Sequence, residues 1–313
     1  MYDNIDFILT KEQAGNIDLL AEIPLLLCKP SEHRFNDGES VTISGYIDNL
    51  KVSVTDNRVK IYDNSLCKWY LKDNFQTLCR GDIKRAIEKI SDLSHLPIKK
   101  AEVTRIDLAQ NFIVRFETPV YYNHLGLLQF YNRLEQSRGL YYNNNNRKLI
   151  FYDKVAEYKH KSLPVPEMYQ NSNVLRYEMR FIRQLLKQFN IPELRAELLY
   201  NEQFYINIIN RWHDEYKNIN KIRNTNNIDY TMIKTKEQLK TQALLLLINE
   251  QGGELEFYKC IAEAQKKGDL TKKQAFDLRN LIKDAGKSKL LTSESDIVTE
   301  LDKKVKEAVK YYV

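Results

Sequence analysis

Three short stretches of the chain set charged side chains into an alternating apolar pattern. Residues 104–107 read TRID, residues 147–154 read RKLIFYDK, and residues 175–180 read LRYEMR. Together they supply a tyrosine, two carboxylates and several arginines. A tyrosine can attack a phosphodiester, carboxylates can hold a divalent metal, and arginines can bind phosphate. The set therefore suits a tyrosine that cleaves a DNA strand by transesterification.

Tyr152 is the candidate nucleophile, because it ends an apolar run between a basic flank and Lys154. An unperturbed phenol has a pKa of about 10 and is a poor nucleophile at neutral pH. We expect a metal, or the cations Lys154 and Arg147, to favour the phenolate. Attack would leave a phosphotyrosyl ester and a free 3′-OH, a reversible step that needs no ATP. Tyr141 and Tyr142 are competing candidates on the preceding strand.

Asp107 and Glu178 are the candidate metal ligands. Strand alternation puts Asp107 on the face opposite Ile106 and Leu108, and Glu178 repeats the pattern in the third stretch. If the two strands are neighbours, the carboxylates can converge on Mg²⁺ or Mn²⁺, and the metal would polarise a phosphoryl oxygen. The alternative for each carboxylate is a structural ion pair, because a charged group is expensive to bury unless it is satisfied.

Arginines in the same stretches are the candidate phosphate ligands. Arginine binds phosphate through two parallel hydrogen bonds, so a pair on neighbouring strands could clamp the scissile group. Two further arginines beside the tyrosine and the carboxylate could contact the DNA backbone. The four candidates are Arg105, Arg176, Arg147 and Arg180.

Positive charge is concentrated in the middle of the chain. Residues 51–190 hold 24 Lys and Arg against 14 Asp and Glu, a difference of +10. Residues 1–50 hold 3 against 9, and residues 191–313 hold 21 against 19, so these parts differ by −6 and +2. Clustered Lys and Arg indicate a polyanionic partner. The aromatic residues interleaved with them could stack on the bases of single-stranded DNA, although a solvated basic surface is the simpler alternative.

Several other kinds of site are excluded by missing motifs. The four cysteines form no C-x-x-C pair, the five histidines show no H-x-H or H-E-x-x-H spacing, and no Walker A or G-x-G-x-x-G pattern occurs. Scattered cysteines favour a reduced, cytoplasmic protein. The N-terminus lacks a signal-peptide pattern, and the apolar runs are too short to cross a bilayer, so we expect no contact with a membrane.

The hydrophobic pattern predicts an α+β fold: an N-terminal antiparallel sheet with helices on one face, followed by an all-helical C-terminal region. We place the division at residues 1–190 and 191–313, with an asparagine-rich linker at 218–229. Expected strands lie at 5–9, 41–47, 50–54, 58–62, 66–71, 100–116, 140–142, 148–152 and 174–182. Expected helices lie at 83–90, with Asp82 as N-cap, and at 122–134, 192–199, 204–216, 236–249, 254–266, 272–284 and 293–309.

The three stretches resemble blocks found in phage and plasmid replication initiators of the filamentous phage gene II type, which are rolling-circle nickases. VTRID at 103–107 resembles their Ser/Thr-Arg-Ile-Asp strand. RKLIFYDK resembles their basic–apolar–tyrosine–x–lysine block, and VLRYEMR at 174–180 resembles their Arg-aromatic-Glu-x-Arg strand. The resemblance covers about residues 1–190, and the helical part beyond has no such match.

The resemblance implies that Tyr152 joins to DNA, that Asp107 and Glu178 hold the metal, and that Lys154 stabilises charge. We therefore expect a replication initiator that nicks and rejoins one strand, with single-stranded and origin duplex DNA as partners. The C-terminal helices could bind duplex DNA, a host helicase or a second protomer. The alternatives are a relaxase-like nickase for plasmid transfer, a non-enzymatic DNA-binding regulator, and a structural protein whose charged strands form ordinary ion pairs.

Overall fold

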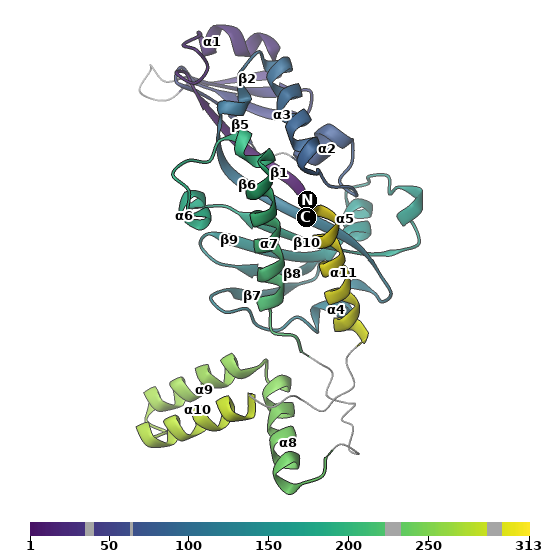
Figure 1. The fold of residues 1–313 in the computed structure, drawn as a ribbon. Coiled ribbons are helices and arrows are strands. Elements are labelled where there is room, and N and C mark those ends of the chain that lie inside the picture. The colour runs from purple at the N-terminus through teal and green to yellow at the C-terminus, as the bar shows by residue number, and fades with distance from the viewer. Residues whose placement is uncertain (35–40, 63–64, 223–232, 287–295) are drawn as a thin grey trace.

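A ten-stranded antiparallel sheet forms the centre of the computed structural model, which describes residues 1–34, 41–62, 65–222, 233–286 and 296–313. The strand order is β2-β3-β4-β5-β1-β6-β10-β9-β8-β7 (Figure 1). The strands are β1 (Tyr2–Thr10), β2 (Cys28–Arg34), β3 (Val41–Ile47), β4 (Leu50–Val54), β5 (Arg58–Ile61), β6 (Glu102–Val114), β7 (Asn132–Gln136), β8 (Gly139–Asn143), β9 (Arg147–Asp153) and β10 (Asn173–Phe181).

Helices connect the strands and then follow them. The first group comprises α1 (Leu19–Glu22), α2 (Leu66–Leu71), α3 (Arg80–Ser94), α4 (Thr118–Tyr122), α5 (Lys154–His160) and α6 (Leu185–Phe189). The second group comprises α7 (Glu202–Asn218), α8 (Lys236–Glu250), α9 (Glu254–Lys267), α10 (Lys272–Gly286) and α11 (Asp296–Tyr312). The expected α+β class, with an N-terminal antiparallel sheet and an all-helical C-terminal region, is confirmed. No helix in these described parts of the chain is long and apolar enough to cross a membrane.

One face of the sheet is apolar, and α7 and α11 lie on it (Figure 1). Phe151 of β9 stacks on Tyr177 of β10 with ring centroids 4.6 Å apart, and Tyr177 stacks on Trp212 of α7 at 4.7 Å. Helix α11 is held to α7 by a 2.6 Å hydrogen bond from the Tyr216 hydroxyl to Asp302. These contacts leave the opposite face of β6, β10 and β9 free to carry polar side chains.

The main hydrophobic core does not stop at the division expected at residue 190. Trp212 of α7 and Leu301 of α11 belong to the same buried cluster as the strands. Helices α8, α9 and α10 instead share a second, smaller cluster that contains Leu245, Ile261 and Ile282. The expected linker begins at the last residue of α7, and its residues 223–229 lie outside the described residues.

Three segments fold differently from the sequence expectation, each for a local reason. Residues 66–71, expected as a strand, form helix α2 because the Ser65 hydroxyl caps it by accepting from the Lys68 amide. Residues 122–134, expected as a helix, contain the end of α4 and the start of β7, with Phe130 in the left-handed region at φ 66°. Residues 192–199, expected as a helix, are helical only from Ala196, as part of a 3-10 helix (Ala196–Tyr200), because the Leu194 carbonyl and the Ala196 amide bond to the backbone of β6 and of Ala101 before it.

The contribution of α11 to the main core can be measured by one substitution. Leu301 is 2% exposed, so Leu301→Ala should lower the free energy of unfolding by about 2–5 kcal/mol through lost burial and a cavity. Leu278→Ala on α10, where the side chain is 38% exposed, is the matched control and should change it by less than about 0.5 kcal/mol. Chemical denaturation followed by tryptophan fluorescence would report both. Equal effects would mean that α11 does not belong to the main folding unit.

Candidate functional site

The polar face of the central strands brings the three sequence stretches together. β6, β10 and β9 are neighbours, and their register places Tyr152 opposite Arg176 and Lys148 opposite Arg180. On the other side of β10, Arg180 lies opposite Asp107. Because side chains alternate between faces, Tyr152, the carboxylates and the arginines of β10 share one surface.

Asp107 and Glu178 lie side by side beneath two partly exposed arginines. Arg105 donates to both oxygens of Asp107, at 2.8 and 2.7 Å. The Arg180 Nε lies 2.6 Å from Glu178 Oε1 and 3.8 Å from Asp107 Oδ2, so this guanidinium joins the two carboxylates. Each carboxylate residue is 2% exposed. Burial and the charge of Glu178 raise the pKa of Asp107 to about 7.

Tyr152 points toward this carboxylate pair. Its hydroxyl donates to Glu178 Oε2 across 3.4 Å. Burial is the largest effect on the hydroxyl and raises the pKa of Tyr152 well above 10, and the positive charge of Arg176 offsets this only in part. In the free protein, burial therefore outweighs the effect of the neighbouring cations on the Tyr152 hydroxyl. Among the described residues, Glu178 is the carboxylate that accepts the hydrogen bond from the Tyr152 hydroxyl.

Lys154 is buried beside Tyr152 instead of facing solvent. Its ammonium lies 5.8 Å from the Tyr152 ring centroid and 2.6 Å from Glu157 Oε2. Burial lowers the pKa of Lys154 to about 8. At neutral pH the ammonium still carries its charge, so it contributes a fixed positive charge close to the phenol.

Arg176, expected as a phosphate ligand, is fully buried. Its Nη1 donates to the Asn74 carbonyl at 3.0 Å and to Asn111 Oδ1 at 3.2 Å, and its Nη2 forms a 2.6 Å ion pair with Asp3. The guanidinium thus ties the loop after α2 to β1 and β6. In this structure a phosphate cannot reach it, because every nitrogen lies beneath the surface.

Arg147 is also misplaced for phosphate binding, since it lies on the apolar face of the sheet. It is ion-paired with Glu215 of α7, and Glu215 also accepts from the Tyr131 hydroxyl. The reason is the strand period: positions 147 and 152 differ by an odd number, so their side chains point to opposite faces. Lys148 occupies Tyr152's face instead, and the same alternation could have identified it.

Two residues of β1 were missed by the sequence reading. Asn4 lies directly opposite Asp107, and its Oδ1 is buried and accepts no hydrogen bond from any described residue. Asp3 makes the ion pair with Arg176. The register of β1 shifts between Tyr2 and Asn4, so simple alternation does not predict that these consecutive side chains both serve the polar face.

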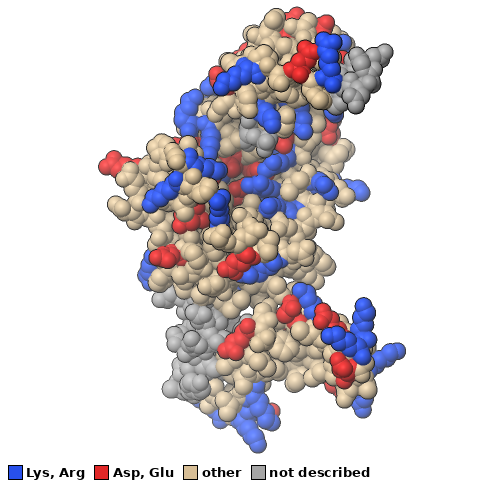
Figure 2. All heavy atoms as spheres, turned by 180° about the vertical axis from the view of Figure 1, so that it is seen from behind, with Lys and Arg blue, Asp and Glu red and all other residues tan. Residues whose placement is uncertain are grey.

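The charges are arranged in a hollow on the face away from α7 and α11. Figure 2 shows acidic atoms at the bottom of this hollow, with Lys and Arg side chains on its sides. Asp107 and Glu178 are buried on this face of the sheet, whereas Arg105 and Arg180 keep side-chain exposures of 23% and 30%. An anion that approaches this face therefore meets arginines first.

The two competing tyrosines, Tyr141 and Tyr142, lie on opposite faces of the sheet. Tyr142 is fully buried on the apolar face, and its hydroxyl donates to the carbonyls of Leu125 and Gly126. It is not available as a nucleophile. Tyr141 lies on the polar face, opposite Ile150 of β9, and lines the same pocket as Tyr152.

The fold and the site together define an α+β protein that presents a tyrosine, a carboxylate pair and arginines on one face of an antiparallel sheet. The family model for the N-terminal region of the replication-associated gene II protein matches residues 1–215, and the chain belongs to this family. It is a replication initiator of the filamentous phage gene II type, which confirms the resemblance noted in the sequence. The match extends beyond residue 190 and includes most of α7. A comparison with curated proteins finds no match.

Proposed function

We propose that the protein initiates rolling-circle replication by nicking one strand at an origin, remaining joined to it through Tyr152 and later rejoining the ends. The observation that carries this proposal is the Tyr152 hydroxyl 3.4 Å from a buried carboxylate, on a face where Arg105, Arg180 and Lys148 are partly exposed. Membership of a replication-associated family supports the role in initiation. The substrate is then single-stranded DNA, exposed within an origin duplex.

The chemical step is an in-line transesterification. Tyr152 Oη forms a bond to phosphorus as its proton passes to Glu178, and the bond from phosphorus to the 3′-oxygen breaks. The 3′-oxygen departs with the electron pair and takes a proton, which leaves a free 3′-OH and a 5′-phosphotyrosyl ester. One phosphodiester replaces another, so attack by a 3′-OH reverses the step without ATP.

Charge stabilisation is the main contribution expected from the protein. Arg105 and Arg180 are partly exposed above the carboxylates and can donate to the non-bridging oxygens of the phosphate. Fixed donors of this kind stabilise negative charge that develops in the transition state. Arg176 acts as a positioning residue because it holds Asp3 and Glu178 in place from below. Lys154 supplies a buried charge beside the ring.

The residues present fit a divalent cation such as Mg²⁺ or Mn²⁺. Asp107 and Glu178 provide hard oxygens, which in this structure are paired with Arg105 and Arg180. The unpartnered Asn4 Oδ1 adds a third oxygen opposite Asp107. Mg²⁺ is usually held by one or two carboxylates together with waters and substrate phosphate. When bound, the cation would supply electrophilic stabilisation of the phosphoryl oxygens.

Removing a proposed metal ligand should weaken cation binding, and this can be measured without any DNA cleavage. Asp107→Asn and Glu178→Gln should each weaken Mn²⁺ binding by at least about tenfold, because a neutral amide replaces a charged oxygen. Electron paramagnetic resonance of free Mn²⁺ during a titration measures this directly. Asp56→Asn, in an exposed turn, is the matched control and should bind Mn²⁺ like the wild type. Unchanged affinity in both site variants would place the cation elsewhere.

The test of the nicking activity is a covalent adduct. The protein would be incubated with labelled single-stranded oligonucleotides that tile its own replicon, with Mg²⁺ or Mn²⁺, and analysed on denaturing gels. An adduct that survives denaturation, with a phosphotyrosyl peptide at Tyr152 in mass spectrometry, would establish a tyrosine nickase. Tight, salt-sensitive binding without an adduct would favour the non-enzymatic regulator, since phosphate contacts alone make affinity fall with salt. A relaxase-like nickase would form the same adduct on a transfer origin.

A further inference from the structure

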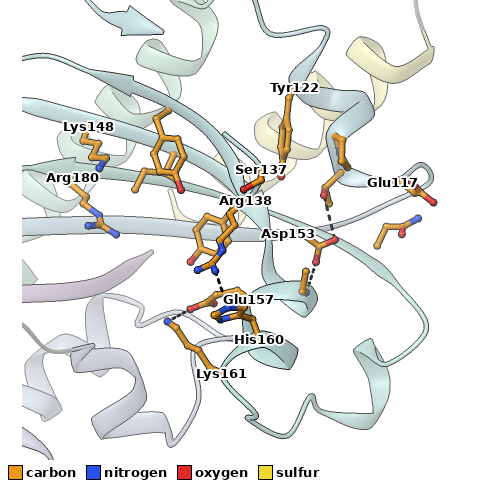
Figure 3. Close-up of a pocket in the computed structure, with 17 residues that line it drawn as sticks. Glu117, Tyr122, Ser137, Arg138, Lys148, Asp153, Glu157, His160, Lys161 and Arg180 are labelled. Atoms are coloured by element: carbon orange, nitrogen blue, oxygen red, sulfur yellow. Dashed lines mark hydrogen bonds and ion pairs between the residues drawn. The ribbon is translucent and has the colours of Figure 1, made fainter. Parts of the chain in front are cut away.

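A pocket of about 780 Å³ adjoins Tyr152. It lies between α4, β8, β9 and α5, and Tyr122, Lys148 and His160 are among the side chains that line it (Figure 3). Its size falls within the range of roughly 300–1,000 Å³ that is usual for pockets that bind small organic ligands. The transesterification proposed above needs Tyr152 and the carboxylates, and it leaves this volume unexplained.

The pocket has basic groups at two separate places. Lys148 and Arg180 stand together at one end, contributed by neighbouring positions of β9 and β10 (Figure 3). Arg138 reaches in from the turn between β7 and β8, and its Nη2 lies 2.8 Å from the Nε2 of His160 on α5. The β8–β9 register carries Arg138 toward the Asp153 end of β9. Lys148 precedes that end by five residues, or roughly 16 Å along an extended strand, so a single phosphate would contact only one of the two groups.

Aromatic surface lies between these basic groups. Tyr141 is half-buried in the pocket wall, and the Lys148 ammonium lies 5.1 Å from its ring centroid. Tyr122 contributes a second, buried ring. A ring with an adjacent cation is the usual platform for an unpaired base and its phosphate, because every base has a π-face that can stack.

We propose that this pocket binds one unstacked nucleotide of the cleaved strand, next to the scissile phosphate. The base lies against Tyr141, one flanking phosphate contacts Lys148, and the other contacts Arg138. The inference rests on the nicking function proposed above and adds the substrate element that the site recognises. A base inside a duplex cannot enter the pocket, so binding selects a strand that is already unpaired.

The proposal can be tested by binding alone, with Tyr152→Phe protein and no divalent metal, so that no chemistry occurs. The probe is 2-aminopurine deoxynucleoside 3′,5′-bisphosphate, whose fluorescence is quenched when the base stacks. The bisphosphate should bind more tightly than either monophosphate. Lys148→Ala protein should bind one of the two monophosphates as tightly as it binds the bisphosphate. The phosphate that this monophosphate lacks is then the one that contacts Lys148.

The stacking contact has its own pair of variants. Tyr141→Leu should weaken probe binding by about 5- to 150-fold, the range that corresponds to loss of one base–aromatic stack. Tyr141→Phe keeps the ring and should bind like the parent protein, which separates loss of stacking from loss of folding. Tyr46→Leu, a tyrosine on β3 that is 40% exposed, is the matched control and should not change binding.

The two proposals can fail independently. If the bisphosphate does not bind, or binds to the Tyr141→Leu and Lys148→Ala proteins as tightly as to the parent protein, the nucleotide pocket is wrong, whatever adduct the wild type forms. If the probe binds as expected and the wild type forms no adduct on any tiled oligonucleotide, the pocket stands and the nicking function fails.

Discussion

Tyr152→Phe is expected to abolish the covalent protein–DNA adduct completely and to leave single-stranded DNA affinity nearly unchanged. The substitution removes only Oη, the atom that would bond to phosphorus. Among the described residues it bonds only to Glu178, across 3.4 Å, so stability should change by no more than about 1 kcal/mol. Denaturing gels measure the adduct, and fluorescence anisotropy with a labelled oligonucleotide measures the affinity.

Tyr141→Phe is the matched control for this experiment. Tyr141 lines the same pocket and also carries a phenol on the polar face, but its hydroxyl has no carboxylate partner among the described residues, so the variant should still form the adduct. An adduct that persists in Tyr152→Phe and disappears in Tyr141→Phe would move the nucleophile to β8. Loss of DNA affinity in Tyr152→Phe would instead mean that the phenol serves binding.

Most of the sheet could be predicted from local sequence signals. The expected strands 41–47 and 50–54 are separated by a tight turn, in which Asp48 has φ 54°, a conformation that Asp tolerates. In the tract of four asparagines at 143–146, Asn144 Oδ1 accepts from the amides of Asn146 and Arg147, which closes the β8–β9 turn. These features depend on residues close together in the chain. For this part of the molecule, the alternation and the turns read from the sequence therefore agree with the observed strand register.

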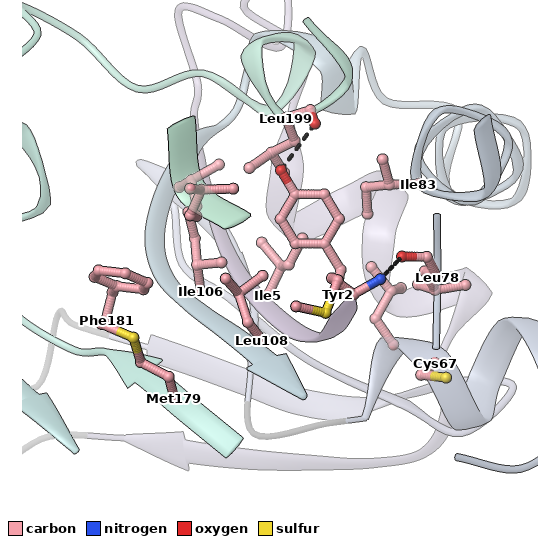
Figure 4. Packing of buried hydrophobic residues seen from close by; sticks show 14 of the residues in the cluster. Tyr2, Ile5, Cys67, Leu78, Ile83, Ile106, Leu108, Met179, Phe181 and Leu199 are labelled. Carbon is pink, nitrogen blue, oxygen red and sulfur yellow. Dashed lines mark hydrogen bonds between the residues drawn. The ribbon is translucent and has the colours of Figure 1, made fainter. Parts of the chain in front are cut away.

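The errors arose where distant contacts override local pattern. Strand β1 begins at Tyr2, earlier than the residue 5 expected, because Tyr2 is enclosed by the core and its hydroxyl donates to the Leu199 carbonyl at 2.9 Å (Figure 4). The segment near Leu194 is held extended by β6. Neither partner can be identified from residues nearby in sequence, so no periodicity rule finds them.

The candidate site was likewise predicted correctly where local pattern decides and incorrectly where distant contacts decide. Period-2 alternation correctly put Asp107 with Arg105, and it suggested that Asp107 and Glu178 could converge if their strands were neighbours, as they are. Alternation alone cannot say how deep a side chain lies. Lys154 was expected to stabilise charge beside Tyr152, and Arg176 was expected to bind phosphate. Both are 0% exposed because the segment at Phe75 and helix α5 cover that end of the face.

Arg176→Ala is expected to destabilise the protein strongly and not to act primarily on DNA affinity. The guanidinium is buried among Asp3, Asn74 and Asn111, and its removal leaves a buried carboxylate without its partner. Loss of one member of a buried ion pair typically lowers the free energy of unfolding by about 3–5 kcal/mol. Urea denaturation would measure the loss, and the double variant with Asp3→Asn should recover part of it because the uncompensated charge is gone.

Arg180 lies on the same strand and face, but Arg180→Ala should affect DNA binding more than stability. Its side chain is 30% exposed, so stability should change less, while the dependence of log affinity on log salt should become shallower by about 0.7 for one lost phosphate contact to a single strand. If Arg176→Ala instead kept its stability and reduced the salt dependence, Arg176 would have to become accessible to DNA. The ion pair with Asp3 would then be an alternative state of a phosphate ligand, and the polar face would have to open before it could bind its substrate.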